Sequence, residues 1–201
     1  GSGALWDLRA HSLDLAQFLV GDSIARVSGH LRTFVDERPV ADDTDDPPDA
    51  NGGENTETRP VTVDDAYTAQ VEFEGGAMGV FEASRCASGH KNSNAIEVTG
   101  SDGAIRFDLE RLNELDVYTG DSRGFETVLV TDPDDPYVDR WWPPGHTLGW
   151  EHTLVHENYE FLCSAVGSGA SHSPDFQAGL AVQRLLDAIK RSDDRGEWVS
   201  V

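Results

Sequence analysis

Hydrophobic residues recur with a helical period at both ends of the chain and alternate with polar residues through its middle. The N-terminal pattern predicts a helix that ends at Gly21 and buries an apolar stripe formed by Leu8, Leu15 and Leu19. The chain is therefore predicted to begin and end with helices and to form strands between them.

The C-terminal part of the chain carries two helical patterns, over residues 151–166 and 174–191. The second is predicted to begin with Ser173 as its N-cap and Pro174 at its first helical position. A short strand over residues 197–201 follows it. The apolar face of the last helix is formed by Leu185, Leu186 and Ile189.

The alternating patterns predict a series of short strands. The first covers residues 24–35, and a hairpin lies within residues 66–85. Consecutive strands joined by short turns imply a largely antiparallel sheet, so the class is α+β. Four more strands are predicted over residues 95–99, 104–109, 114–118 and 125–130.

The hairpin is the clearest strand signal in the chain. Its two runs are joined by Gly75-Gly76, a dipeptide typical of two-residue turns, which fixes the register of the side chains. On one face we expect the pairs Phe73–Met78 and Val71–Val80, together with Tyr67, and on the other Gln70, Glu72 and Phe81.

Residues 41–58 have almost nothing to bury, because they are mostly Asp, Glu, Pro, Gly, Asn and Thr. They are predicted to form a mobile acidic loop and not an interdomain linker, since the strands after them need strand 24–35 as a partner. A single domain over residues 1–201 is expected, and the length is sufficient for one core.

The charge of the chain is strongly negative, at −22 for 201 residues, and only two of its fifteen basic residues are lysines. This composition is typical of proteins adapted to high salt, where screening removes self-repulsion. A merely acidic protein with one acidic loop is the alternative. Nucleic acid and anionic membranes are poor partners for such a surface.

The apolar runs and the cysteines of the sequence bear on the location of the protein and on its thiol chemistry. No apolar run is long enough to span a membrane, and the N-terminus has no signal-like pattern, so a soluble cytoplasmic protein is expected. Cys86 and Cys163 are widely separated, and we expect two buried or half-buried free thiols.

The first helix carries a row of ionisable side chains, Asp7, His11 and Asp14. Around the helix axis, His11 and Asp14 lie roughly 40° and 20° from Asp7, on opposite sides. An imidazole oriented by a carboxylate one turn away is the arrangement of a general base. A first-turn Asp also complements the helix dipole, and a His beside acids is often a simple surface residue.

Other candidates stand further along the chain. Arg85, His90, Lys91 and Asn92 form a cluster of donors that suits a polyol or a sugar phosphate, or a solvated strand end. The order H-x-x-x-H-E at His152 and His156 does not fit the metalloprotease motif, and we expect no metal. A neighbouring group of aromatic residues could line a pocket or fill a core: Tyr137, Trp141, Trp142 and Trp150.

Several of these motifs together resemble the C-terminal domain of Gfo/Idh/MocA-type oxidoreductases, the glucose–fructose oxidoreductase and inositol dehydrogenase group. The N-terminal stretch G-A-L-W-D-x-x-x-H-x-x-D resembles the start of that domain, and the order and spacing of all the matching segments together carry the resemblance. The other matching segments are Asp65-Ala66, the Gly75-Gly76 hairpin, residues 97–108, W-P-P-G-H at residues 142–146, P-x-F-x-x-G at residues 174–179 and G-E-W-V-S-V at residues 196–201.

The resemblance implies an open, predominantly antiparallel sheet with helices on one face, and oligomers formed through the uncovered sheet face. It implies oxidation or reduction of a sugar or polyol with NAD or NADP. Asp7 and His11 take the places of the family's catalytic Asp and His, and a catalytic Lys comes from the nucleotide-binding domain. It also suggests His146 and His152 as substrate contacts, beside Arg85 and Asn92 from the donor cluster.

Two departures from the family pattern matter. Arg9 stands where the family usually has Gly, so the local backbone must tolerate a side chain. The chain also has no G-x-G-x-x-G strand–helix unit, so we expect a fragment without the N-terminal Rossmann domain, with no bound cofactor and no activity of its own.

The sequence leaves three candidate functions for the chain. The first is the substrate-binding and oligomerisation domain of an NAD(P)-dependent sugar or polyol dehydrogenase. The second is a non-catalytic carbohydrate-binding or scaffold domain of the same fold. The third, a metal-dependent hydrolase or isomerase, requires the histidine cluster to bind a metal.

Overall fold

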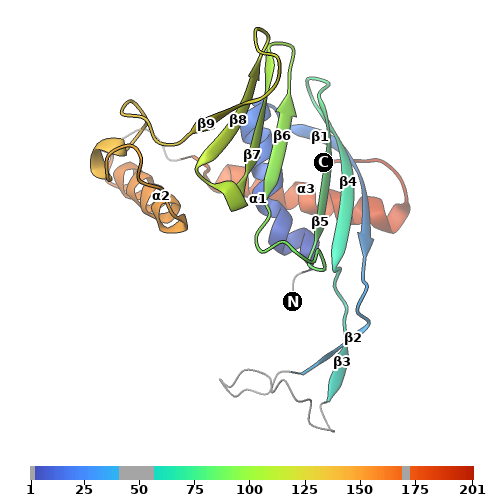
Figure 1. Ribbon diagram of the computed structural model, residues 1–201. Coiled ribbons are helices and arrows are strands. Elements are labelled where there is room, and N and C mark those ends of the chain that lie inside the picture. Colours follow the sequence, from blue (N-terminus) through green and yellow to red (C-terminus); the bar gives the residue numbers. More distant parts are fainter. Residues whose placement is uncertain (1–2, 41–56, 169–172) are drawn as a thin grey trace. The chain divides into compact units, whose positions relative to one another are not determined.

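The computed structural model describes residues 3–40, 57–168 and 173–201. The chain, shown in Figure 1, divides into two compact units. Unit 1 comprises residues 1–17, 21–88 and 181–201, and unit 2 comprises residues 18–20 and 89–180. Helices together with antiparallel sheets confirm the predicted α+β class.

Unit 1 is built on a four-stranded sheet with the order β10-β1-β4-β5, in which all neighbours are antiparallel. The predicted pairing of the first strand with the hairpin is confirmed. The strands are β1 (Ile24–Arg32), β4 (Ala66–Phe73), β5 (Met78–Ser84) and β10 (Val199–Ser200), and the helices are α1 (Ala4–Val20) and α3 (Phe176–Arg195).

Both helices cover the same face of this sheet (Figure 1). Gly29 of β1 lies so close to α3 that a Cβ there would be 2.7 Å from Cγ2 of Ile189. The guanidinium of Arg9 on α1 lies over the ring of Tyr67 on β4, which is on the same sheet face as Gly29. The predicted apolar face of the last helix is confirmed, because Leu185, Leu186 and Ile189 are all buried.

Helix α1 ends at Val20 with Gly21 as its C-cap, as predicted, but it buries a different face from the one expected. Leu5, Leu13 and Ala16 are buried, whereas Leu8 and Leu15 are half-buried and Leu19 is exposed. The prediction was wrong because leucines occur on more than one side of the helix, so they do not by themselves identify its buried face. The buried face also contains the small residues Ala4, Ser12 and Ala16, which let the helix approach the sheet closely.

The hairpin exists, but its predicted register was wrong by one residue. Glu72 pairs with Met78 and Val71 with Gly79, so the turn has three residues and not two. Gly76 takes φ +94°, a conformation that glycine adopts readily. A slip of one residue reverses every side chain of a strand, so Met78 and Val80 are exposed (81% and 77%) and Phe81 lies on the buried face.

The first strand is shorter than predicted and is followed by a small two-stranded ribbon. The ribbon pairs β2 (Glu37–Pro39) with β3 (Thr58–Pro60), so Thr58 belongs to a strand that the sequence did not predict. Residues 41–56, which make up most of the predicted acidic loop, lie outside the described residues.

Unit 2 contains a second antiparallel sheet, with the order β6-β7-β8-β9, and its four strands confirm the prediction. Among the described residues, no helix is long and apolar enough to cross a membrane. The elements are β6 (Ala95–Thr99), β7 (Gly103–Asp108), β8 (Glu114–Thr119), β9 (Glu126–Leu129), the 3₁₀ turns η1 (Leu109–Arg111) and η2 (Val138–Arg140), and α2 (Trp150–Ala165).

Two smaller expectations are corrected. Helix α3 begins at Phe176, because the carboxylate of Asp175 accepts hydrogen bonds from the amides of Gln177 and Ala178 at 2.9 and 3.0 Å. Asp175, and not Ser173, is therefore the capping side chain.

Both cysteines are free as predicted, but Cys86 is exposed and only Cys163 is half-buried.

Candidate functional site

Asp7 and Arg85 form an ion pair in unit 1. Asp7 lies in the first turns of α1, Arg85 directly follows β5, and Nη2 of Arg85 donates to Oδ2 of Asp7. About half of each side chain remains exposed. The structure thus brings together a predicted catalytic residue and a predicted substrate-binding residue that are 78 positions apart in the sequence.

His11 lies one turn after Asp7 on the same helix, and its imidazole is exposed. Asp14, the third member of the predicted row, is half-buried. Because the buried face of α1 is formed by Leu5, Leu13 and their neighbours, the row occupies the opposite side of the helix. Asp7 and His11 are therefore accessible to a small molecule.

Asp64 and Asp65 connect the elements that carry this pair. The backbone carbonyl of Asp64 accepts from the Ala4 amide at 2.9 Å, and its carboxylate accepts from the Leu5 amide at 2.8 Å. The backbone carbonyl of Asp65 accepts from the Arg85 amide at 2.9 Å.

The side chain of Asp65 is itself fixed. It accepts from the amides of Phe34 and Val35 and from Arg38, at 2.8, 3.0 and 2.9 Å. The two backbone hydrogen bonds, followed by the bond and charge of Arg38, lower the pKa of Asp65 below its usual value.

Arg9 lies on the buried side of α1, where the family resemblance leads one to expect glycine. Its Nη1 donates to the Ser12 hydroxyl at 3.2 Å, and its guanidinium carbon lies 5.4 Å from the centre of the Tyr67 ring. Among the described residues, Nε of Arg9 and the Tyr67 hydroxyl have no hydrogen-bond partner. Burial lowers the pKa of Arg9 and raises that of Tyr67.

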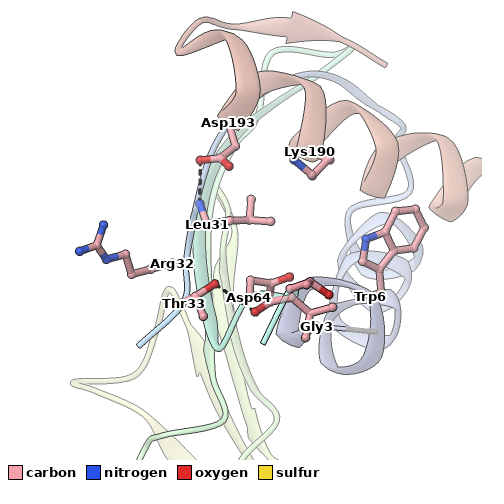
Figure 2. A pocket seen from close by; sticks show the side chains of 10 residues that line it. Gly3, Trp6, Leu31, Arg32, Thr33, Asp64, Lys190 and Asp193 are labelled. Carbon is pink, nitrogen blue, oxygen red and sulfur yellow. Dashed lines mark hydrogen bonds between the residues drawn. The ribbon is translucent and has the colours of Figure 1, made fainter. Parts of the chain in front are cut away.

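A polar cavity of about 290 Å³ also lies in unit 1 (Figure 2). Asp64, Lys190 and Asp193 line it together with Trp6, but Asp7, His11 and Arg85 do not. Three of its charged groups have protein partners: Asp193 accepts from the Leu31 amide at 3.0 Å, Lys190 donates to Asp194 at 2.5 Å, and Asp64 binds the start of α1. We therefore assign it no catalytic role.

Asn92, a predicted substrate contact, belongs to unit 2. The carboxylate of Glu110 accepts from the amides of Lys91 and Asn92 at 2.6 and 2.9 Å, and lies 3.5 Å from His90. The two backbone bonds lower the pKa of Glu110. Asn92 is thus held by its backbone, and its exposed side chain is not used by these bonds.

His152 and His156 lie on one face of α2, in contact with aromatic residues of the preceding loop. Nδ1 of His152 accepts from the Gly149 amide at 3.0 Å, which caps the helix. Nε2 of His156 accepts from the Trp141 indole at 2.6 Å, and Tyr137 stacks on the same imidazole at 4.4 Å. Burial, with the charge of His152, lowers the pKa of His156.

His146 lies on the exposed loop before α2. Its Nδ1 is 2.8 Å from the carbonyl oxygen of Pro143, and its ring contacts Trp142. No group of three or more potential metal ligands occurs among residues 3–40, 57–168 and 173–201. Sequence reasoning named Asp65 only as part of a matching segment and did not name Asp64 or Glu110; the roles of all three depend on hydrogen bonds with backbone groups distant in the sequence.

The matching family model is the GFO/IDH/MocA C-terminal domain, over residues 1–106. Levoglucosan dehydrogenase of Pseudarthrobacter phenanthrenivorans is 39% identical over 207 residues, covering 100% of this chain and 52% of that protein. The chain therefore spans about half the length of this curated relative.

Two solved structures are also similar over the whole chain. An oxidoreductase domain protein from Kribbella flavida has a TM-score of 0.89 and 44% identity, with 51% of that structure covered. Levoglucosan dehydrogenase in complex with NADH and L-sorbose has a TM-score of 0.88 and 37% identity, also with 51% covered.

The chain has an α+β fold with antiparallel sheets, and the family model matches slightly more than half of it. The chain belongs to the GFO/IDH/MocA family and corresponds to its C-terminal domain.

Proposed function

We propose that the chain is the substrate-binding domain of an NAD(P)-dependent sugar or polyol oxidoreductase. The observation that carries this proposal is the exposed side of α1, where Asp7 is held by Arg85 and His11 follows one turn later. Membership of the family supports it, as does the similarity to a levoglucosan dehydrogenase whose structure contains NADH and a sugar.

The proposed reaction moves a hydride from a secondary alcohol carbon and a proton from its hydroxyl. The nicotinamide, when bound to the full-length protein, supplies the hydride acceptor. Nε2 or Nδ1 of His11 accepts the hydroxyl proton, and the electrons of the O–H bond form the second C–O bond of the carbonyl. In the reverse reaction the imidazole returns the proton to the oxygen. Asp7 orients His11 or assists it, and Arg85 fixes the Asp7 carboxylate.

The remaining proposed contacts serve to bind the sugar or polyol. Hydroxyl-rich ligands need several donors and acceptors at fixed positions. Arg85 has donors beyond those used by Asp7, and the amide of Asn92 is exposed. His152 keeps Nε2 available because Nδ1 accepts from Gly149, and His146 is exposed on its loop. We propose these four residues as substrate contacts.

The test uses the full-length protein, with NAD⁺ or NADP⁺ and a panel of sugars and polyols. His11→Ala and Asp7→Ala should each lower kcat/KM by about 10²-fold or more, the usual contribution of a positioned acid or base. Asp14→Ala is the matched control on the same helix and should change kcat/KM less than threefold. Normal turnover by both variants would contradict the assigned roles.

Absence of dehydrogenase activity together with sugar binding would support the second candidate function. If the full-length protein binds sugars but reduces neither nucleotide with any of them, the chain is a carbohydrate-binding or scaffold domain of the same fold. Isothermal titration with the same panel distinguishes this outcome from a panel that lacks the substrate, because binding without reduction appears only in the first case.

A further inference from the structure

The segment before β4 contacts both halves of the proposed site in unit 1. Asp64 binds the first turn of α1, which carries Asp7, and Asp65 binds the backbone of Arg85. Asp7 and Arg85 come from parts of the sequence 78 positions apart. Two consecutive residues therefore fix the relative positions of both partners of the ion pair.

The hydrogen bonds to α1 are well placed to hold that helix. The first amides of a helix have no partner within it and need acceptors from elsewhere. Asp64 supplies two, its carbonyl oxygen for Ala4 and its carboxylate for Leu5. Asp64 is only 9% exposed, so water is a poor substitute for its carboxylate.

The approach of Asp64 to α1 is unusually close. A Cβ built at Gly3 would lie 2.0 Å from Oδ1 of Asp64, so the carboxylate occupies space that only glycine leaves free (Figure 2). Asp65 is 2% exposed, and its carboxylate is held by the amides of Phe34 and Val35. The segment is thus fixed to the residues that follow β1 on one side and to α1 and Arg85 on the other.

We infer that Asp64 is a positioning residue of the proposed active site, which sets the place of Asp7 through the first turn of α1. This inference rests on the proposed function. Asp65 completes the arrangement by fixing Arg85 through its backbone carbonyl. Displacement of α1 by a fraction of an ångström would move the catalytic carboxylate and the imidazole of His11 together.

The test compares Asp64→Ala, Asp64→Asn and Asp22→Ala in the full-length protein. Asp22 is a matched control, because its carboxylate also accepts from backbone amides, those of Ser23 and Gly75 at 2.8 and 2.6 Å, but at the other end of α1. Asn at position 64 keeps one acceptor oxygen for Leu5, so it should restore the geometry that Ala removes.

We expect Asp64→Ala to lower kcat at least fivefold with KM for the sugar or polyol within twofold of the unmodified protein, at a temperature where the variant is folded. Asp64→Asn should remain within twofold in kcat, and so should Asp22→Ala. Unchanged kcat in Asp64→Ala would overturn the inference, and so would an equal loss of kcat in Asp22→Ala.

A second measurement does not depend on activity. Hydrogen exchange of the Leu5 amide should become at least tenfold faster in Asp64→Ala and stay unchanged in Asp22→Ala. If the full-length protein shows no dehydrogenase activity, the proposed function fails, and the exchange rates still decide whether Asp64 holds α1. Unchanged Leu5 exchange in Asp64→Ala would overturn the positional claim itself.

Discussion

The indole N–H of Trp141 donates a 2.6 Å hydrogen bond to Nε2 of His156. This bond requires the neutral imidazole, since a protonated ring has no acceptor. It joins the loop before α2 to one face of that helix, where the ring of Tyr137 also stacks on His156. One of the hydrogen bonds that attach this loop therefore depends on the charge of a single histidine.

The first prediction concerns pH. The folded-state pKa of His156 is lowered, so the unfolded chain binds the proton more readily. The stability contribution is fully present above the unfolded-state pKa, about 6.5, and it is lost as the pH falls through the lower folded-state value. Melting temperature and near-ultraviolet circular dichroism should both decrease over this interval.

His156→Gln offers the control for the pH experiment. Its amide can accept from Trp141 but cannot be protonated in this range, so the decrease below pH 6.5 should become smaller. An identical pH dependence in this variant would assign the effect to other groups.

The second prediction concerns the contact between Gly3 and Asp64. Gly3→Ala should destabilise the protein by about 1–3 kcal/mol, the usual cost of overpacking a closely packed site. Urea denaturation measures this change. Gly124→Ala is the control, because no atom lies within 4 Å of a Cβ at that position, and it should change the free energy of unfolding much less.

The third prediction concerns the Tyr67 hydroxyl, which has no hydrogen-bond partner among the described residues. Tyr67→Phe removes a buried unsatisfied group and keeps the ring under Arg9, so stability should be unchanged or increased by up to about 1 kcal/mol. Tyr137→Phe is the comparison, because that hydroxyl donates to Glu160 and its loss should destabilise. A clear loss of stability in Tyr67→Phe would show that its hydroxyl has a partner.

The fourth prediction tests the proposed adaptation to high salt. With a net charge of −22, the folded chain repels itself, and screening by salt should relieve this repulsion. The melting temperature should rise by several degrees between 0.1 and 2 M KCl. A melting temperature that is constant or decreases over this range would contradict the proposal.

The sequence was sufficient to predict elements whose signal is local. The strands of unit 2 and the apolar face of α3 were found, because alternation and helical periodicity are properties of neighbouring residues. The hairpin register failed because Gly75-Gly76 suits a turn of either two or three residues, and only pairing with β4 decides between them.

The candidate site, like the fold, could be predicted from the sequence only where its residues lie close together along the chain. Asp7 and His11 were recognised because they lie one turn apart on one helix. The role of Asp64 was not, because its bond to Leu5 joins residues 59 positions apart and an Asp before a strand has no distinctive local pattern. The pairing of Arg85 with Asp7 was missed for the same reason.

The bond between Leu5 and Asp64 joins residues 59 positions apart and closes a loop that contains the acidic segment 41–56. Loop-closure entropy depends only weakly on length, so deleting the whole of this segment would change it by about 0.3 kcal/mol. The length of the segment therefore has little effect on the geometry around Asp7. Insertions or deletions within residues 41–56 are therefore expected to leave the start of α1 in place.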